Sequence, residues 1–202
     1  MSDFKLVLDT SNEYLYVSVL SGNTNEVLSH HIQVGNNNHS ETLVNVIKEV
    51  LDKLGITPAD LTEIWVGRGP GSYTGVRVAC CVAKVMAYAL KIKLFYFSSL
   101  DLLYSRFLQN DGVYKVHMDA RRGFTYAKVV EIKEGKVKII MDETYLENVT
   151  LDNEYKEAID VNQKIGFSIE ESYDIKALAN AGLLTKVEDI HRFVPKYLRS
   201  GI

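Results

Sequence analysis

The sequence predicts an α/β fold with two tandem lobes, residues 1–100 and a shorter one over residues 101–202. Three observations lead to this prediction. Strand-like runs precede helical patterns in the first half, and the second half begins in the same way. Each half opens with a short apolar strand that ends in an aspartate, Asp9 and Asp119. A glycine-rich loop at 67–77 stands between a strand-like run and a long apolar helical run.

The elements of the first lobe follow in order from its periodicity. Strands at 6–9, 14–20 and 26–33 are joined by short connections, which predicts a three-strand meander. After a polar loop, Asn38 and Glu41 are spaced as a helix-capping pair, and the helix ends at Gly55. A strand at 64–66, a helix at 76–90 and a strand at 94–97 follow, and a helix from 98 to about 108 leads into the second lobe.

The second lobe begins with the same pattern. Strands at 114–119, 124–132 and 137–141 again predict a meander, followed by weaker signals for a strand at 165–167 and a helix at 176–184. A shift of 110 residues relates four identical pairs: Asp9 and Asp119, Tyr16 and Tyr126, Val19 and Val129, and Val27 and Val137. A repeated lobe is the economical interpretation, and chance similarity of two hairpins is the alternative.

Composition limits the classes of function. With 47% hydrophobic and 24% charged residues, the chain can bury a sizeable core. A net charge of −3 argues against nucleic-acid binding by the chain alone, because neutralising phosphates needs a basic face. The sequence offers one tight basic cluster for such a face, formed by Lys115, Arg121, Arg122 and Lys128.

The cysteines and the apolar runs indicate the compartment. Cys80 and Cys81 are adjacent, which excludes a disulfide framework and predicts two small buried side chains in a reducing cytosol. The run from Val78 to Leu90 contains Lys84 and is too short to span a bilayer. No signal-peptide pattern opens the sequence, so we expect a soluble, cytoplasmic protein.

The glycine-rich loop matches none of the common catalytic loops. A P-loop needs a lysine after its last glycine, a nucleophile elbow needs Gly-x-Ser-x-Gly, and a dinucleotide fingerprint should follow the first strand. We therefore interpret the loop as structural: its glycines let the strand turn into the helix, with Ser72 or Thr74 as the helix cap. Its members are Gly67, Gly69, Pro70, Gly71, Ser72, Thr74 and Gly75.

The helix after this loop is apolar on almost every side. Gly75, Ala79, Ala83 and Ala87 form a narrow stripe of small side chains, and Val78, Val82, Met86 and Ala89 cover an adjoining face. The first long helix presents Leu43, Val46, Ile47 and Val50. These two stripes predict a surface that pairs with a partner protein or with a second copy of the chain. Packing within the chain is the alternative.

Two lobes that each open with a strand ending in aspartate resemble the actin-like ATPase, or ribonuclease H-like, fold. In its active members, these acids hold Mg²⁺ and phosphate. Here Asp9-Thr10-Ser11 could serve a phosphate, but Asp119-Ala120-Arg121-Arg122-Gly123 places two arginines where a phosphate cradle needs glycines. We expect both aspartates to cap their own turns, and we expect no competent ATP hydrolysis. The histidines show no metal-binding spacing.

Several motifs resemble the TsaB (YeaZ) family. The strongest is Gly67 to Arg77, which is similar to the family's G-R-G-P-G-S-[FY]-T-G-V-R. Residues 119–123, followed by Tyr126, are similar to D-A-R-x-G-x-x-Y. Residues 9–11, His39-Ser40 and the run from Pro195 to Arg199 match shorter family motifs.

The resemblance implies a function. Members of this family are non-catalytic subunits in the formation of N6-threonylcarbamoyladenosine in tRNAs that read codons beginning with A. They bind the TsaD-type catalytic subunit, the TsaE-type ATPase joins the assembly, and the first two long helices form the pairing surface. We expect a homodimer when the partner is absent, and contact with tRNA only through the complex. We expect no cofactor on the chain alone, with a nucleotide at a partner interface left open.

Within that assembly, Asp9, Arg121 and Arg122 are candidates for tRNA or phosphate contacts. Two other classes of function remain as alternatives. One is an autonomous ATPase of the actin-like type. The other is a peptidase-like hydrolase, which would need Ser72, Cys80 or Cys81 beside a histidine.

Overall fold

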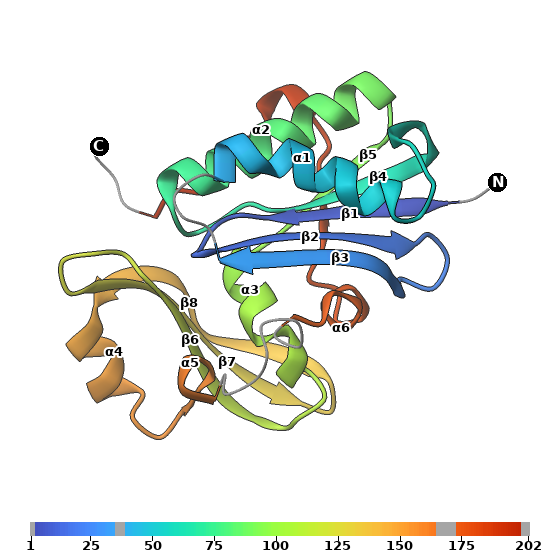
Figure 1. Ribbon diagram of the computed structural model, residues 1–202. Coiled ribbons are helices and arrows are strands. Elements are labelled where there is room, and N and C mark those ends of the chain that lie inside the picture. Colours follow the sequence, from blue (N-terminus) through green and yellow to red (C-terminus); the bar gives the residue numbers. More distant parts are fainter. Residues whose placement is uncertain (1–2, 35–38, 165–172, 199–202) are drawn as a thin grey trace.

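Two β-sheets with helices packed on them form the frame of the molecule (Figure 1). The structure is a computed structural model, and it describes residues 3–34, 39–164 and 173–198. The predicted α/β class with two lobes is confirmed, because each sheet begins with a three-strand meander.

The first sheet has the strand order β10-β5-β4-β1-β2-β3. Its antiparallel meander consists of β1 (Phe4–Asp9), β2 (Tyr14–Ser21) and β3 (Val27–Val34). Parallel pairing adds β4 (Leu61–Gly67) and β5 (Lys93–Phe97), and antiparallel pairing adds β10 (Thr185–Lys186). Helices α1 (His39–Asp52) and α2 (Tyr73–Leu90) cover one face, and the short turn η1 (Pro58–Asp60) precedes β4.

The second sheet has the order β8-β7-β6-β9, which repeats β3-β2-β1-β4 of the first. Its strands are β6 (Gly112–Asp119), β7 (Phe124–Lys133), β8 (Lys136–Glu147) and β9 (Ile159–Asp160). The remaining elements are α3 (Ser99–Tyr104), η2 (Ser105–Phe107), α4 (Asn148–Glu154), α5 (Val161–Lys164), α6 (Ile175–Asn180) and η4 (Ile190–Arg192). Helices α3 and α6 lie between the two sheets (Figure 1).

The lobes repeat in strand order but not in register. Asp9 lies opposite Tyr16 in the first hairpin, whereas Asp119 lies opposite Thr125 in the second. The turn of the second hairpin is therefore one residue shorter, and the 110-residue shift places Tyr126 opposite Met118 instead.

Two large apolar cores hold the chain together. One lies between the first sheet and helices α1 and α2. The other fills the space between the two sheets, where Val7 and Trp65 of the first lobe share a cluster with Val116 and Val130 of the second. Because burial of apolar surface is the main favourable term in folding, this shared core ties the lobes to each other.

Several predicted boundaries differ from the structure. Strand β8 continues to Glu147, six residues past its predicted end, and the helix α4 that follows was not predicted. The predicted helix at 176–184 is α6, which ends at Asn180 because Gly182 takes a left-handed conformation (φ 72°) soon after. The predicted strand at 165–167 and the predicted cap Asn38 lie outside the described residues.

The C-terminal segment, residues 185–198, packs on the first lobe although the predicted division assigns it to the second. Strand β10 pairs with β5, and Phe193 is buried in the core beneath α2. The Lys196 amide donates to the Arg68 carbonyl at 2.9 Å, while the Lys196 ammonium lies 2.6 Å from the buried Glu143 carboxylate of β8. This segment therefore contacts both lobes.

Among the described residues, α2 alone is long and apolar enough to cross a membrane by length and composition. Core helices of soluble proteins meet the same criterion, and six residues of α2 are buried within the chain.

Candidate functional site

The glycine-rich loop closes around the turn that follows β1. Asp9 is buried, and its Oδ1 accepts hydrogen bonds from the amide (2.7 Å) and the hydroxyl (2.6 Å) of Ser11. Its Oδ2 accepts from the hydroxyl of Ser99 at 2.6 Å. The Ser99 oxygen in turn accepts the Gly69 amide at 3.2 Å, so one serine at the start of α3 joins the aspartate to the loop.

Three loop glycines approach this turn so closely that no side chain fits. A Cβ on Gly67 would lie 1.8 Å from the Asp9 carboxylate. A Cβ on Gly71 would lie 2.2 Å from the Ser11 carbonyl, and one on Gly75 would lie 1.9 Å from the Thr10 carbonyl. Of the two predicted caps, Ser72 is the one used, because its oxygen accepts the Gly75 amide at 3.3 Å. The glycines of the loop thus allow the turn after β1 to pack directly against the start of α2.

The residues present do not fit the Mg²⁺ and phosphate site of active actin-like enzymes. A metal-binding carboxylate needs oxygens that face the ligand, and both oxygens of Asp9 are engaged by serines inside the protein. At the second strand end, the Asp119 carboxylate accepts the Arg121 amide at 2.8 Å and caps its own turn. In the described part of the chain, no group of three or more His, Cys, Asp or Glu side chains could hold a metal ion.

The predicted basic cluster and the predicted role of Asp9 in ligand contact are both wrong. Asp9 is 3% exposed and does not reach the surface. Lys115 and Lys128 are buried in ion pairs, with Asp152 at 2.8 Å and Asp101 at 2.6 Å. Only Arg121 and Arg122 of the cluster are exposed, at the tip of the β6–β7 hairpin. Adjacent strands carry the two lysines toward separate acidic partners, which spacing along the sequence does not show.

The eight residues predicted to form a partner surface are buried in the chain's own core. They are Leu43, Val46, Ile47, Val50, Gly75, Ala79, Ala83 and Ala87. The small side chains let α2 approach the sheet closely, as shown by the Cys80 thiol, which lies 3.8 Å from the Gly67 carbonyl. The alternative of packing within the chain is therefore correct for these residues.

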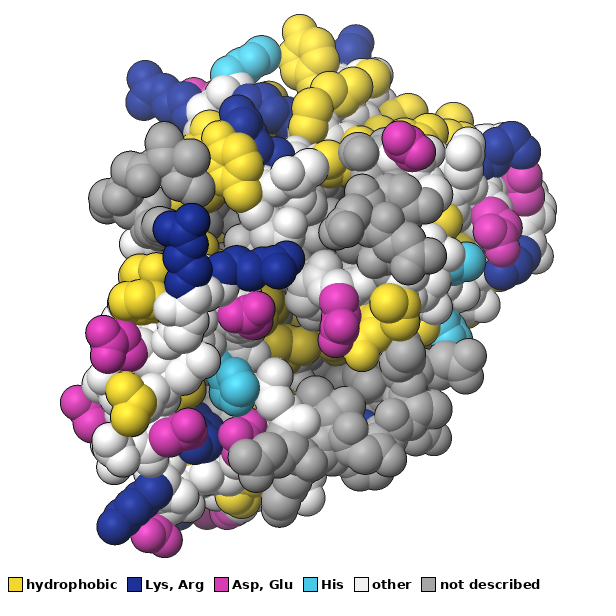
Figure 2. Space-filling model, turned by 60° about the vertical axis from the view of Figure 1, so that its left-hand side comes forward, with side chains coloured by type: hydrophobic (Ala, Val, Ile, Leu, Met, Phe, Trp, Pro, Cys, Tyr) yellow, Lys and Arg dark blue, Asp and Glu magenta, His cyan; other side chains and the backbone are white. Residues whose placement is uncertain are grey.

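An outward side of α2 is apolar as well, and one exposed apolar residue of α1 adds to it. Val44 of α1 is exposed, as are Cys81 and Val85 of α2, and Val78 and Val82 are half-buried beside them. We call these five residues the outer helix surface. Val78 and Val82 belong to the adjoining face noted in the sequence, whereas Val44, Cys81 and Val85 gave no separate signal. Figure 2 shows hydrophobic side chains gathered along the upper edge of the molecule, where the helices of the first lobe lie.

The two cysteines differ in environment. Burial raises the pKa of the Cys80 thiol to about 12, so it stays protonated at neutral pH. A nucleophilic cysteine needs the opposite shift, which removes Cys80 from the hydrolase alternative. Cys81 is exposed, contrary to the prediction that both are buried, because it points away from the sheet on the outer side of α2.

Comparisons with known proteins agree with the motifs. The family model described as TsaD, tRNA N6-adenosine threonylcarbamoyltransferase, matches residues 26–191. The chain is 28% identical to the tRNA threonylcarbamoyladenosine biosynthesis protein TsaB of Bacillus subtilis, over 96% of this chain and 93% of that protein. It is 26% identical to the protein of the same name from Escherichia coli, over 60% of this chain and 52% of that protein.

A solved structure shows the same fold. YeaZ from Pseudomonas aeruginosa superposes with a TM-score of 0.74 at 23% identity, and the match covers 98% of this chain and 100% of that one. The predicted actin-like, ribonuclease H-like fold is confirmed. The chain therefore belongs to the family that the matching model describes, and its motifs and relatives identify it as a member of the TsaB (YeaZ) family within it.

Proposed function

We propose that this protein is a non-catalytic subunit in the formation of N6-threonylcarbamoyladenosine in tRNA. The names of its relatives support a role in this pathway. In this proposal it binds a TsaD-type catalytic subunit in the cytoplasm, away from membranes, and a TsaE-type ATPase joins them. The chain alone holds no cofactor, a nucleotide would bind only at a partner interface, and tRNA is reached only within the complex.

The observation that carries the non-catalytic role is the inward-facing Asp9. This carboxylate occupies the position where active relatives of the fold need a ligand-facing acid. Ser11 and Ser99 bind both of its oxygens, and Gly67 packs against it without room for a Cβ. A buried acid whose two oxygens accept three hydrogen bonds from serines inside the protein stabilises a turn and is not turned toward a metal ion or a phosphate.

The outer helix surface is the proposed binding site for the catalytic subunit. Val85 is 60% exposed and Val44 is 59% exposed, and exposed apolar side chains that gather on one face are typical of protein-binding surfaces. A partner built on a similar fold can present a matching helix pair. Without it, two copies can cover the stripe around a two-fold axis, which gives the expected homodimer.

A charged substitution on this surface tests the proposal. Val85→Arg should abolish capture of the catalytic subunit and of a second copy, because the partner would bury an unpaired charge. Val149→Arg is the matched control, since Val149 is 58% exposed on α4 in the second lobe. Pull-down of the catalytic subunit and sedimentation at micromolar concentration measure both effects. Equal binding by both variants would place the interface elsewhere.

Activity assays test the role itself. Catalytic subunit, tRNA and threonylcarbamoyl-adenylate should give modified nucleoside only when this chain and the TsaE-type ATPase are present. The chain with tRNA and the donor alone should give none. Modification by the isolated chain would refute the non-catalytic role, and ATP hydrolysis by the isolated chain would support the alternative of an autonomous ATPase.

A further inference from the structure

The tip of the β6–β7 hairpin carries two arginines in a backbone conformation that arginine disfavours. Arg121 and Arg122 have φ values of 70° and 57°, and Gly123 follows at 80°. Two consecutive left-handed positions in a tight hairpin turn are usually occupied by Asn-Gly or Gly-Gly. Most other residues are disfavoured at these positions, because their Cβ is too close to the backbone in the left-handed conformation. Arginines at these two positions lower stability relative to glycine, which points to a use for their charge. We call this pair the arginine tip.

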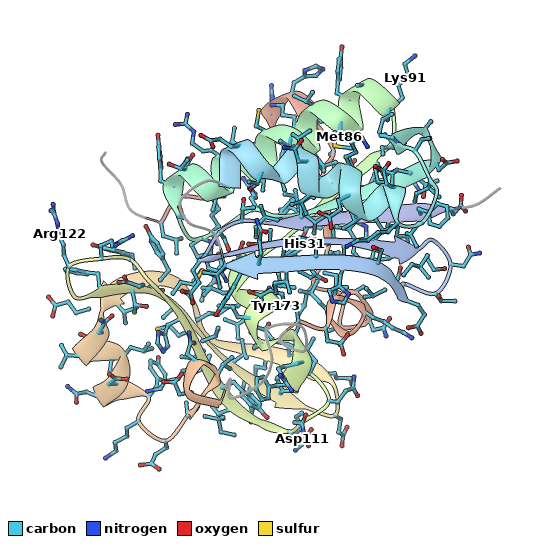
Figure 3. All side chains as sticks on the ribbon, in the orientation of Figure 1. His31, Met86, Lys91, Asp111, Arg122 and Tyr173 are labelled. Carbon is cyan, nitrogen blue, oxygen red and sulfur yellow. The ribbon has the colours of Figure 1, made fainter. Side chains whose placement is uncertain are left out.

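Both arginines are exposed and directed away from the core. Figure 3 shows Arg122 extending outward from the end of the hairpin. The neighbouring Asp119 carboxylate accepts the Arg121 amide and belongs to the turn. The tip therefore presents two guanidinium groups to solvent, and such groups bind phosphate oxygens with good geometry.

A second cluster lies at the start of α2. The rings of Tyr73 and Tyr197 are 5.2 Å apart, and each residue is 47% exposed. The Arg77 guanidinium lies 4.8 Å from the Tyr73 ring centroid and donates to the Tyr73 hydroxyl at 2.7 Å. We call these three residues the tyrosine–arginine stack. Exposed rings beside an ordered guanidinium are the groups on which unpaired bases of RNA stack.

A chain of contacts across the two lobes places both clusters on one side of the molecule. Lys196, next to Tyr197, pairs with Glu143 of β8. Two residues along β8, Tyr145 stacks on Phe124 at 4.8 Å, and Phe124 directly follows the arginine tip and Gly123. Figure 1 shows the start of α2 and the β6–β7 hairpin at the same end of the molecule, and Figure 2 shows basic and hydrophobic side chains together on the face brought forward from that end.

We propose that the arginine tip and the tyrosine–arginine stack form one RNA-binding surface across the two lobes, with the arginines on phosphates and the tyrosines on an unpaired base. The proposal rests on the proposed function, because the net charge of −3 leaves RNA binding to the assembled complex. The surface adjoins the outer helix surface, since Arg77 lies one turn before Cys81 on α2, but it differs in chemistry, because the members of the outer helix surface are apolar. Combined guanidinium and aromatic groups favour RNA over protein as the ligand.

The experiment measures binding of a tRNA transcript that reads a codon beginning with A to the complex of this chain with its catalytic subunit. Fluorescence anisotropy over a series of NaCl concentrations gives affinity and salt slope. The double variant Arg121→Gly, Arg122→Gly should reduce the magnitude of the slope of log K against log[salt] by about 1.4 to 1.8, since each of two phosphate contacts contributes about 0.7 to 0.9. Tyr197→Ala should lose about tenfold in affinity with an unchanged slope.

Two controls separate this loss from other causes. The double variant Lys133→Ala, Lys136→Ala removes the same charge from the β7–β8 hairpin at the opposite end of β7, and it should bind as the wild type does. The arginine-to-glycine variant should have an unchanged or higher Tm, because glycine suits the left-handed positions.

Other outcomes overturn the proposal. An unchanged salt slope in the arginine variant, or an equal loss in the lysine control, would contradict it. Loss of the catalytic subunit in a pull-down with the arginine variant would assign the tip to protein binding instead. If wild-type protein captures the catalytic subunit and supports modification while the arginine variant binds tRNA normally, only this proposal fails. If the wild type captures no catalytic subunit, the proposed function fails and this proposal fails with it.

Discussion

Asp9 stands where active members of the fold place a ligand-binding acid, and its neighbours turn it inward. The sequence shows that a strand ends at Asp9 and that Ser11 can close the turn. It does not show Ser99, which lies 90 residues away and occupies the second carboxylate oxygen. Nor does it show that Gly67 is required for lack of space, since its backbone does not need a left-handed conformation. Such contacts depend on how β1, β4 and α3 meet in three dimensions.

Gly67→Ala should destabilise the protein by about 3 kcal/mol. The added Cβ would lie 1.8 Å from the Asp9 carboxylate, and moving that group would disturb its bond to Ser99 inside the core. Gly55→Ala is the control, because a Cβ added to Gly55 would have no neighbouring atom within 4 Å. Only the left-handed φ of 64° at Gly55 opposes a side chain. That cost is about 1 kcal/mol. Urea unfolding compares the two, and equal losses would contradict the steric role of Gly67.

Helix α2 shows what an element's pattern can and cannot predict. Its length, its cap and its nearly continuous apolar surface are all readable from the sequence. Which apolar face meets the sheet is not, because small residues suit close packing against a sheet as well as against a partner helix. The structure buries the small stripe and leaves the side with Cys81 and Val85 outward. The choice follows from Gly75 and Cys80, which contact the turn after β1 and the end of β4.

The cysteines provide a footprint of the outer helix surface. Iodoacetamide at pH 8 should alkylate exposed Cys81 in the folded protein, while Cys80, buried and with a pKa of about 12, should react only after unfolding in urea. Binding of the catalytic subunit should then protect Cys81. Peptide mapping by mass spectrometry measures both sites. The Val85→Arg variant mixed with the catalytic subunit is the control, and its Cys81 should stay reactive. Full reactivity of Cys81 in the wild-type complex would contradict the proposed interface.

At the scale of the whole molecule, the two meanders were predictable, and the return of the C-terminal segment to the first sheet was not. Both meanders follow from runs of alternating or continuous apolar residues. Strands β9 and β10 have two residues each, too few for any periodicity, yet β10 returns the chain to the first sheet. The C-terminal segment then contacts Arg68 in one lobe and Glu143 in the other. Long-range pairing of this kind is decided by the assembled sheet.

The buried pair Asp101–Lys128 allows a test of whether the two lobes unfold together. Asp101 belongs to α3 between the sheets, and Lys128 to β7 of the second lobe, with 2.6 Å between carboxylate and ammonium. Burial raises the pKa of Asp101, and the Lys128 ammonium opposes that rise. Lys128→Ala would leave a buried carboxylate without its partner and should cost about 3–5 kcal/mol.

Unfolding of the first lobe can be followed separately, by the fluorescence of its tryptophan. Trp65, the chain's single tryptophan, lies in β4 and packs in the core shared by both sheets. Because that core is continuous, Lys128→Ala should lower the urea midpoint reported by Trp65 fluorescence as much as the midpoint reported by far-UV circular dichroism. Lys138→Ala removes an exposed lysine from a surface pair with Glu131. It should lower the free energy of unfolding reported by either probe by less than about 1 kcal/mol. A Trp65 transition that stays in place while the dichroism shifts would show that the lobes unfold independently, contrary to the shared core.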